Sequence, residues 1–209
     1  MKISFTDKDS HEYNYISCFY NHKKDYVFLS KKVCYSTFCS FDKRKCVRTW
    51  EINDTSILNG LVRNPYTRLE SLYRDKFIKN VDNLKSGWCK HCGAKPAIQH
   101  CQTHIVDFFG EEKFYNQEIS FKEFILALPT FIDKECHFFP QSKFIPKFID
   151  KLYYLENKED LNNLFKLFDV ESVVVNKTYE KNFEWDNQMC DVVNTCYYED
   201  FQRFGYKLN

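Results

Sequence analysis

The clearest change of hydrophobic period in the chain lies between Ile57 and Phe77. The first half of this stretch is a short apolar run, which is typical of a buried parallel strand. Pro65 then stands where a helix would begin, because proline is pre-set for the first helical turn. Beyond it, side chains suited to one buried helix face recur at spacings of three and four: Leu69, Leu72, Tyr73, Lys76 and Phe77. The pattern predicts a strand that passes directly into a helix.

The rest of the chain alternates between short apolar runs and helical periods. Ser120 and Glu123 form a capping box for a short buried helix, which Pro129 is expected to close. Asp186 is expected to cap a final helix that carries apolar positions as far as Phe201. The other predicted strands cover residues 25–30, 46–53 and 151–156, and residues 1–24 are expected to supply an edge strand or a loop. One further helix is expected to begin at Ser36 or Thr37, and another to cover residues 160–168. Strands and helices in this alternation indicate an α/β fold.

The length and composition of the chain indicate the size of the domain and which classes of partner its charge favours. The chain has 209 residues, of which 44% are hydrophobic and 18% aromatic, enough for one compact domain with its own core. The formal net charge is +1, so composition gives no electrostatic case for a nucleic acid or a membrane surface as partner. No window reaches the apolar length of a membrane span, and the first residues lack the apolar core of a secretory signal. We therefore expect a single-domain cytoplasmic protein over residues 1–209.

Two stretches offer places for an anionic group. Residues 31–41 follow a predicted strand and lead into a helix, whose N-terminal amides and dipole favour an anion, with a lysine and hydroxyls as further donors. Arg63 lies at the carboxyl end of a predicted strand, and Ser71 lies two turns into the next helix. Ligands of open α/β sheets usually bind at this edge. An arginine there can bind a phosphate through a forked pair of hydrogen bonds, to which a serine hydroxyl adds one more.

The string from Val62 to Phe77, VRNPYTRLESLYRDKF, closely resembles a known nucleotide-binding motif. It is similar to the 3′-phosphate-binding motif of sulfotransferases that use 3′-phosphoadenosine 5′-phosphosulfate (PAPS), in particular the carbohydrate sulfotransferase family (sulfotransferase family 2). In that family an arginine ends the strand, a serine follows eight positions later, and both bind the 3′-phosphate. The resemblance implies this role for Arg63 and Ser71.

Residues 31–38 resemble the 5′-phosphosulfate loop of the same family. The positions that match in order are Lys32, Ser36, Thr37 and Phe38. Two positions depart from the family pattern, because Lys31 stands where proline is common and Tyr35 stands where a small residue is usual. The resemblance implies that Lys32, Ser36 and Thr37 bind the 5′ side of PAPS. The glycines of a nucleoside-triphosphate loop are missing.

Two later segments extend the resemblance. His137, Pro140 and Gln141 match three positions of the His-Trp-x-Pro-Gln signature of family members, and residues 197–206 resemble the Tyr-x-x-Asp-Phe-x-x-Phe-Gly-Tyr close of many members. The resemblance, in patches from Tyr26 to Tyr206, implies a P-loop-like, mostly parallel sheet flanked by helices. It also implies transfer of a sulfuryl group from PAPS to an acceptor hydroxyl, and family association favours a saccharide acceptor. For the base we place His137 first, since histidine titrates near neutral pH, and Glu51 second.

Residues 86–105 form a small Cys/His-rich insertion. Cys89 and Cys92 have the spacing of a zinc-ligand pair, and Cys101 with His104 forms a second pair of similar reach. His91 and His100 could substitute for one of these ligands, and the alternative is a free loop with incidental thiols.

Two other functions remain open from the sequence. The insertion and Tyr35 would also fit a zinc-stabilised binding or adaptor module with an inactive nucleotide site. A small kinase is the rival enzyme. A preference for a 3′-phosphorylated nucleotide over ATP separates the sulfotransferase from both.

Overall fold

A computed structural model describes residues 16–21, 26–30, 46–47, 57–79, 103–134, 137–171 and 183–209. The chain divides into two compact units. The first comprises residues 1–64, 140–179 and 202–206, and the second comprises residues 65–139, 180–201 and 207–209. Each unit is described by itself.

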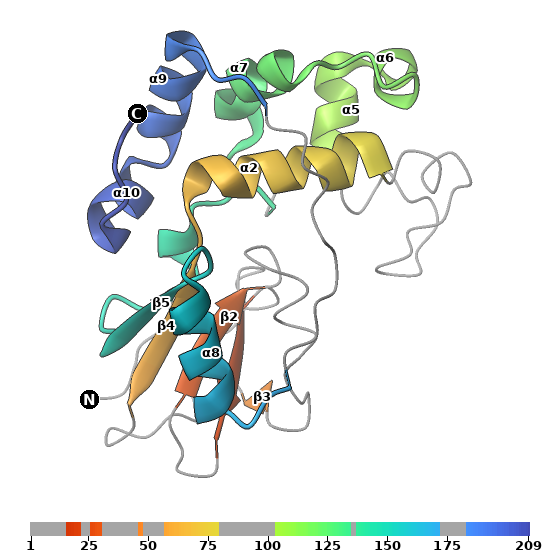
Figure 1. The fold of residues 1–209 in the computed structure, drawn as a ribbon. Coiled ribbons are helices and arrows are strands. Elements are labelled where there is room, and N and C mark those ends of the chain that lie inside the picture. The colour runs from red at the N-terminus through yellow and green to blue at the C-terminus, as the bar shows by residue number, and fades with distance from the viewer. Residues whose placement is uncertain are drawn as a thin grey trace. The chain divides into compact units, whose positions relative to one another are not determined.

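The first unit contains a five-stranded sheet in the order β3-β1-β2-β4-β5 (Figure 1). Its strands are β1 (Ile16–Tyr20), β2 (Tyr26–Ser30), β3 (Cys46–Val47), β4 (Leu58–Val62) and β5 (Lys151–Tyr154). β4 pairs in parallel with both β2 and β5, whereas β1 pairs antiparallel with β2 and β3. The prediction of a mostly parallel sheet is therefore confirmed for β2, β4 and β5 and wrong for β1 and β3. Residues 21–25 are too short a connection for a parallel crossover, which takes a dozen or more residues.

β4 lies in the middle of the parallel part and is buried along its whole length. Gly60 pairs with Phe28 of β2 and Leu152 of β5. A Cβ atom at Gly60 would lie 3.2 Å from side-chain atoms of both Ile145 and Leu152. A glycine at this position therefore allows a close approach of neighbouring side chains. The apolar run in the sequence correctly predicted a strand covered on both faces.

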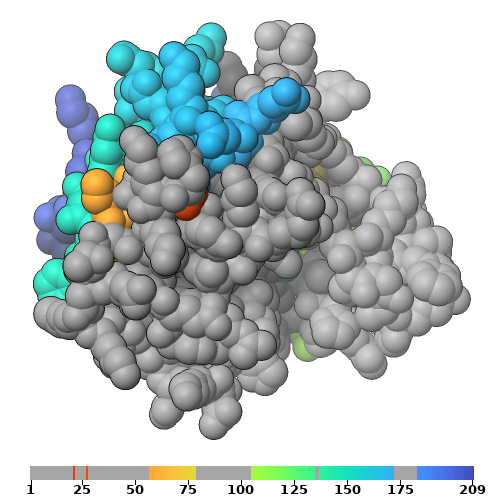
Figure 2. Space-filling view, turned by 90° about the horizontal axis from the view of Figure 1, so that it is seen from below, coloured from red at the N-terminus to blue at the C-terminus, as the bar shows by residue number. Residues whose placement is uncertain are grey.

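α8 (Lys158–Leu167) covers one face of this sheet (Figure 1). Its buried Leu164 belongs to a core cluster whose other buried members are Val27, Leu61, Tyr153 and Phe168. The Asn157 side chain caps the helix by accepting hydrogen bonds from the amides of Glu159 and Asp160. The outer side chains of α8 are polar and exposed, and Figure 2 shows this surface in teal to blue. The predicted strand and helix in this region are confirmed, with the strand two residues shorter than expected.

The second unit is helical. Its first helix is α2 (Pro65–Tyr73), which begins at the predicted proline and continues as the π-helix η4 (Arg74–Lys79). The other helices of its described part are α5 (Thr103–Phe109), α6 (Glu111–Tyr115), α7 (Phe121–Phe131), α9 (Asn187–Cys196) and the start of α10 (Tyr198–Phe204). The direct passage from strand to helix that the sequence predicted is confirmed.

Aromatic side chains form the core of this unit. The ring of Tyr73 lies 5.1 to 5.6 Å, between ring centroids, from four phenylalanine rings. These rings belong to Phe77, Phe121, Phe124 and Phe183. Aromatic pairs at such separations stabilise a core beyond the area that they bury. The apolar face predicted for α2 is thus the face that packs into this aromatic core.

Two expected helix boundaries are wrong. Pro129 lies inside α7 rather than at its end, and the helix continues to Phe131 before Ile132 caps it. Proline interrupts one backbone hydrogen bond, but burial of Leu128 and Phe131 holds the last turn in place. The single helix expected from Asp186 to Phe201 is divided into α9 and α10 at Tyr197. The Asp186 cap itself is confirmed, because its carboxylate accepts from the Met189 amide.

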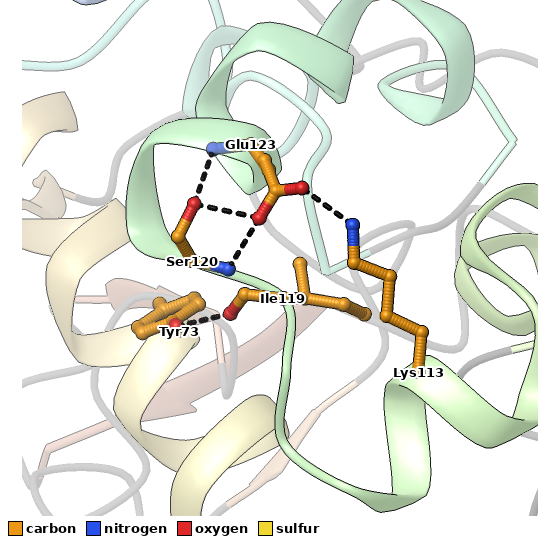
Figure 3. Close-up of polar contacts among 5 residues, drawn as sticks. All are labelled: Tyr73, Lys113, Ile119, Ser120 and Glu123. Carbon is orange, nitrogen blue, oxygen red and sulfur yellow. Dashed lines mark hydrogen bonds and ion pairs between the residues drawn. The ribbon is translucent and has the colours of Figure 1, made fainter.

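The capping box of α7 is present and extended by a lysine (Figure 3). The Glu123 amide donates to Ser120 Oγ at 3.2 Å, and the Ser120 amide donates to Glu123 Oε2 at 2.8 Å. Lys113 Nζ lies 2.5 Å from the other carboxylate oxygen of Glu123. The lysine, followed by the hydrogen bonds from Ser120, lowers the Glu123 pKa from 4.5 to about 2. The same turn is held by Tyr73, whose hydroxyl donates to the Ile119 carbonyl.

We expect Glu123→Gln to reduce the free energy of unfolding at pH 7 by about 1 kcal/mol, since solvent screens an exposed ion pair. A carboxylate whose pKa is lowered by folding stabilises the native state above the unfolded pKa, and this contribution is lost as the pH falls from 4.5 to about 2. The difference between wild type and variant should therefore shrink across this range in urea unfolding. Glu112→Gln, at an exposed position on α6, is the control. A difference that stays constant with pH would contradict this role.

Candidate functional site

The carboxyl ends of β2, β4 and β5 lie at one edge of the sheet in the first unit, because the three strands are parallel. Val62 at the end of β4 pairs with Tyr154 at the end of β5. Arg63 follows Val62 directly, and Lys32 follows the last residue of β2 by two positions. Ligands of open α/β sheets bind outside these carboxyl ends. This edge is therefore the candidate site.

The main chain of Arg63 is held by the side chain of Gln141. The Arg63 amide donates to Gln141 Oε1 at 2.8 Å, and Gln141 Nε2 donates to the Arg63 carbonyl at 2.6 Å. Gln141 is fully buried and begins the short 3-10 helix η5 (Gln141–Lys143). Its carboxamide thus forms a reciprocal pair of hydrogen bonds with the peptide groups of the residue that follows β4.

The next peptide is held by a carboxylate. Glu156 Oε1 accepts from the Asn64 amide at 2.8 Å, and Glu156 Oε2 accepts from the Tyr206 hydroxyl at 3.2 Å. The Tyr206 ring also meets the Tyr154 ring edge-on, with centroids 5.6 Å apart. Arg203 donates to the carbonyls of Ser142 and Pro146. Residues 203–206 near the end of the chain therefore support the same edge of the sheet.

In the second unit, the backbone around His137 is fixed by two buried side chains. Nη2 of Arg68 donates to the carbonyls of His137 and Phe139 at 3.0 and 2.7 Å. The Tyr197 hydroxyl donates to the Phe138 carbonyl at 2.6 Å. Burial raises the pKa of Tyr197, so this phenol stays a neutral donor. Three successive carbonyl groups are thus bound by side chains from α2 and from the boundary between α9 and α10.

The structure describes three of the residues that the sequence assigned to the site. Arg63 belongs to the first unit, and Ser71 and His137, both half-buried, belong to the second. Most of the others lie outside the described residues: Lys32, Ser36, Thr37, Glu51, Cys89, Cys92 and Cys101. His104 lies in α5, but its side chain is not described. The assignments of all these residues stay predictions.

The described residues contain neither a metal-ligand group nor a membrane-spanning helix. Among them, no three histidine, cysteine or carboxylate side chains are grouped so that they could hold a metal ion. In the same part of the chain, no helix combines the length and apolar character needed to cross a membrane.

The comparison with family models decides the classification. A model of the sulfotransferase family matches residues 10–207, nearly the whole chain. The chain belongs to the sulfotransferase family. Comparisons with curated proteins and with solved structures gave no match. The resemblance found in the sequence is thereby confirmed, and the protein is a transferase of sulfuryl groups.

The matched range includes both hydrogen-bonding side chains at the end of β4. Gln141 lies in the His-x-x-Pro-Gln segment and Glu156 follows β5, so both belong to the sulfotransferase domain itself. Sequence reasoning matched Gln141 to a motif but found no role for it. For the segment that ends at Glu156, the sequence pattern predicts a strand with a scaffold role. Only the contacts with the main chain of Arg63 and Asn64 reveal what these side chains do.

We expect Tyr197→Phe to lower the free energy of unfolding of this sulfotransferase by about 1–2 kcal/mol, because the buried Phe138 carbonyl would lose its donor. Urea unfolding followed by circular dichroism measures the change. Tyr198→Phe is the matched control, since the neighbouring tyrosine is 58% exposed. Equal effects of the two substitutions would show that the hydroxyl of Tyr197 does not stabilise this segment.

Proposed function

We propose that the protein transfers a sulfuryl group from PAPS to a hydroxyl of an acceptor, with a saccharide or glycoconjugate favoured by the family. The observation that carries this proposal is the junction of β4 and α2. Arg63 directly follows a parallel strand, and the helix begins two residues later at Pro65. A cationic side chain at this place, next in the chain to a helix N-terminus, suits a phosphate group.

The nucleotide is proposed to bind through two groups of residues. Arg63 and Ser71 bind the 3′-phosphate, as the motif implies. Lys32, Ser36 and Thr37 bind the 5′ side. The parallel pairing of β2 and β4 supports this arrangement, because the segments that carry Lys32 and Arg63 both leave the sheet at its carboxyl edge.

The proposed reaction is an in-line displacement at sulfur. The acceptor oxygen forms a bond to sulfur while a base removes its proton, and the bond from sulfur to the bridging oxygen breaks. The electron pair of that bond leaves with 3′,5′-ADP. Lys32 would neutralise the charge that grows on the bridging oxygen, and such interactions lower the barrier because they strengthen in the transition state. His137 is the first candidate for the base and Glu51 the second.

A small kinase and a zinc-stabilised adaptor with an inactive nucleotide site are the rival functions. The family match argues against both, since it covers residues 10–207 as a sulfotransferase domain. The decisive property is the 3′-phosphate. A kinase should prefer ATP, and an adaptor should bind neither nucleotide.

We expect 3′,5′-ADP to raise the melting temperature of the protein more than ATP does at equal concentration. Arg63→Ala should weaken 3′,5′-ADP binding in titration calorimetry by about 1.5–3 kcal/mol, the scale of a hydrogen bond to a charged group. Unchanged affinity in a folded Arg63→Ala variant would remove the main support for the proposed site.

Turnover assays should separate the roles of the catalytic candidates. We expect Lys32→Ala to reduce turnover much more than it weakens 3′,5′-ADP binding. His137→Ala should reduce the rate by about a hundredfold or more with nucleotide affinity little changed, as expected for loss of a general base. If Glu51→Gln abolishes activity while His137→Ala retains it, the base is the carboxylate.

We also propose that the insertion binds one structural zinc ion through Cys89, Cys92, Cys101 and His104. The spacing of these residues in two pairs supports a zinc site. Protein purified without added zinc should contain close to one equivalent by elemental analysis, and chelation should lower its stability, because a structural zinc contributes directly to folding. Less than about a third of an equivalent, with no change on chelation, would favour the free loop.

A further inference from the structure

At the end of β4, the main chain stops pairing with β5 and needs other hydrogen-bond partners. The Leu155 amide donates to the Val62 carbonyl at 2.9 Å, just beyond the paired residues of β4 and β5. The next residue, Arg63, still has an amide and a carbonyl to satisfy. Gln141 binds both of them, at 2.8 and 2.6 Å, from a position 78 residues further along the chain. A side-chain amide thus takes the place of a neighbouring strand.

The main chain is held on the other side of Arg63 as well. Glu156 accepts from the Asn64 amide at 2.8 Å. Pro65 then fixes its own φ angle and restricts the conformation of the residue before it. The Cα atom of Arg63 therefore lies between two peptide groups that are held by hydrogen bonds to the side chains of Gln141 and Glu156. Few torsions of its main chain remain free to change.

We propose that Gln141 is a positioning residue for recognition of the nucleotide 3′-phosphate, acting through the main chain of Arg63. This inference rests on the proposed function, in which the Arg63 guanidinium binds that phosphate. A side chain that starts from a fixed Cα atom has less conformational freedom to lose when it binds its ligand. Loss of the two hydrogen bonds from Gln141 would release the peptide and weaken this single contact with the nucleotide.

The contribution of the 3′-phosphate is measured by comparing 3′,5′-ADP with 5′-AMP, which lacks it. Gln141→Met keeps most of the side-chain volume and removes both hydrogen bonds. It should raise the Kd for 3′,5′-ADP about tenfold, the equivalent of one hydrogen bond, and change the Kd for 5′-AMP less than about twofold. Gln202→Met is the matched control, because Gln202 is an exposed glutamine of the same unit. It should change neither Kd.

A double variant tests whether Gln141 acts through Arg63. In the Arg63→Ala background there is no guanidinium to position, so Gln141→Met should change the Kd for 3′,5′-ADP less than about twofold further. Independent effects of the two substitutions, or an equal loss of 5′-AMP and 3′,5′-ADP binding in Gln141→Met, would overturn the proposal.

A second variant covers the case in which Gln141→Met does not fold by circular dichroism. Gln141→Glu keeps an acceptor for the Arg63 amide but offers no donor to its carbonyl when ionised. It should lower the ratio of the Kd for 5′-AMP to the Kd for 3′,5′-ADP, but by less than the roughly tenfold expected for loss of both hydrogen bonds. An unchanged ratio would overturn the proposal. Failure of the proposed function is distinguishable, because wild-type protein would then bind 3′,5′-ADP no more tightly than 5′-AMP.

Discussion

The hydrogen bonds at the end of β4 are the constraint on which the first unit depends. β4 is buried along its length and pairs with β2 on one side and β5 on the other. Past Val62 the pairing of β4 with β5 stops, and the main chain of the half-buried residues Arg63 and Asn64 needs other hydrogen-bond partners. Gln141 and Glu156 supply the missing partners for the next two peptides.

These partners come from segments that are far apart in the sequence. Gln141 lies at the start of the second segment of the first unit, residues 140–179, Glu156 follows β5, and Tyr206 lies near the end of the chain. They meet at the end of β4, where Glu156 accepts from both the Asn64 amide and the Tyr206 hydroxyl. The main chain of Arg63 and Asn64 is thus supported by side chains from three separate positions in the first unit.

The second unit is stabilised differently. Its core consists of aromatic rings around Tyr73, and the carbonyls of residues 137–139 are bound by Arg68 and Tyr197. A buried guanidinium shared by two carbonyls also keeps the backbone next to His137 in one conformation.

The sequence by itself determined the elements whose signals are local. The apolar run of β4, the proline that begins α2, the capping box of α7 and the Asp186 cap each depend on neighbours within a few residues, and the family motif is contiguous as well. Tertiary structure decided the features that depend on residues far apart in the sequence. Packing of Phe131 extended α7 past Pro129, a short connection made β1 antiparallel, and Gln141 acquired its role from a residue 78 positions away. Such pairings depend on which segments the fold brings together, and no spacing along the chain records them.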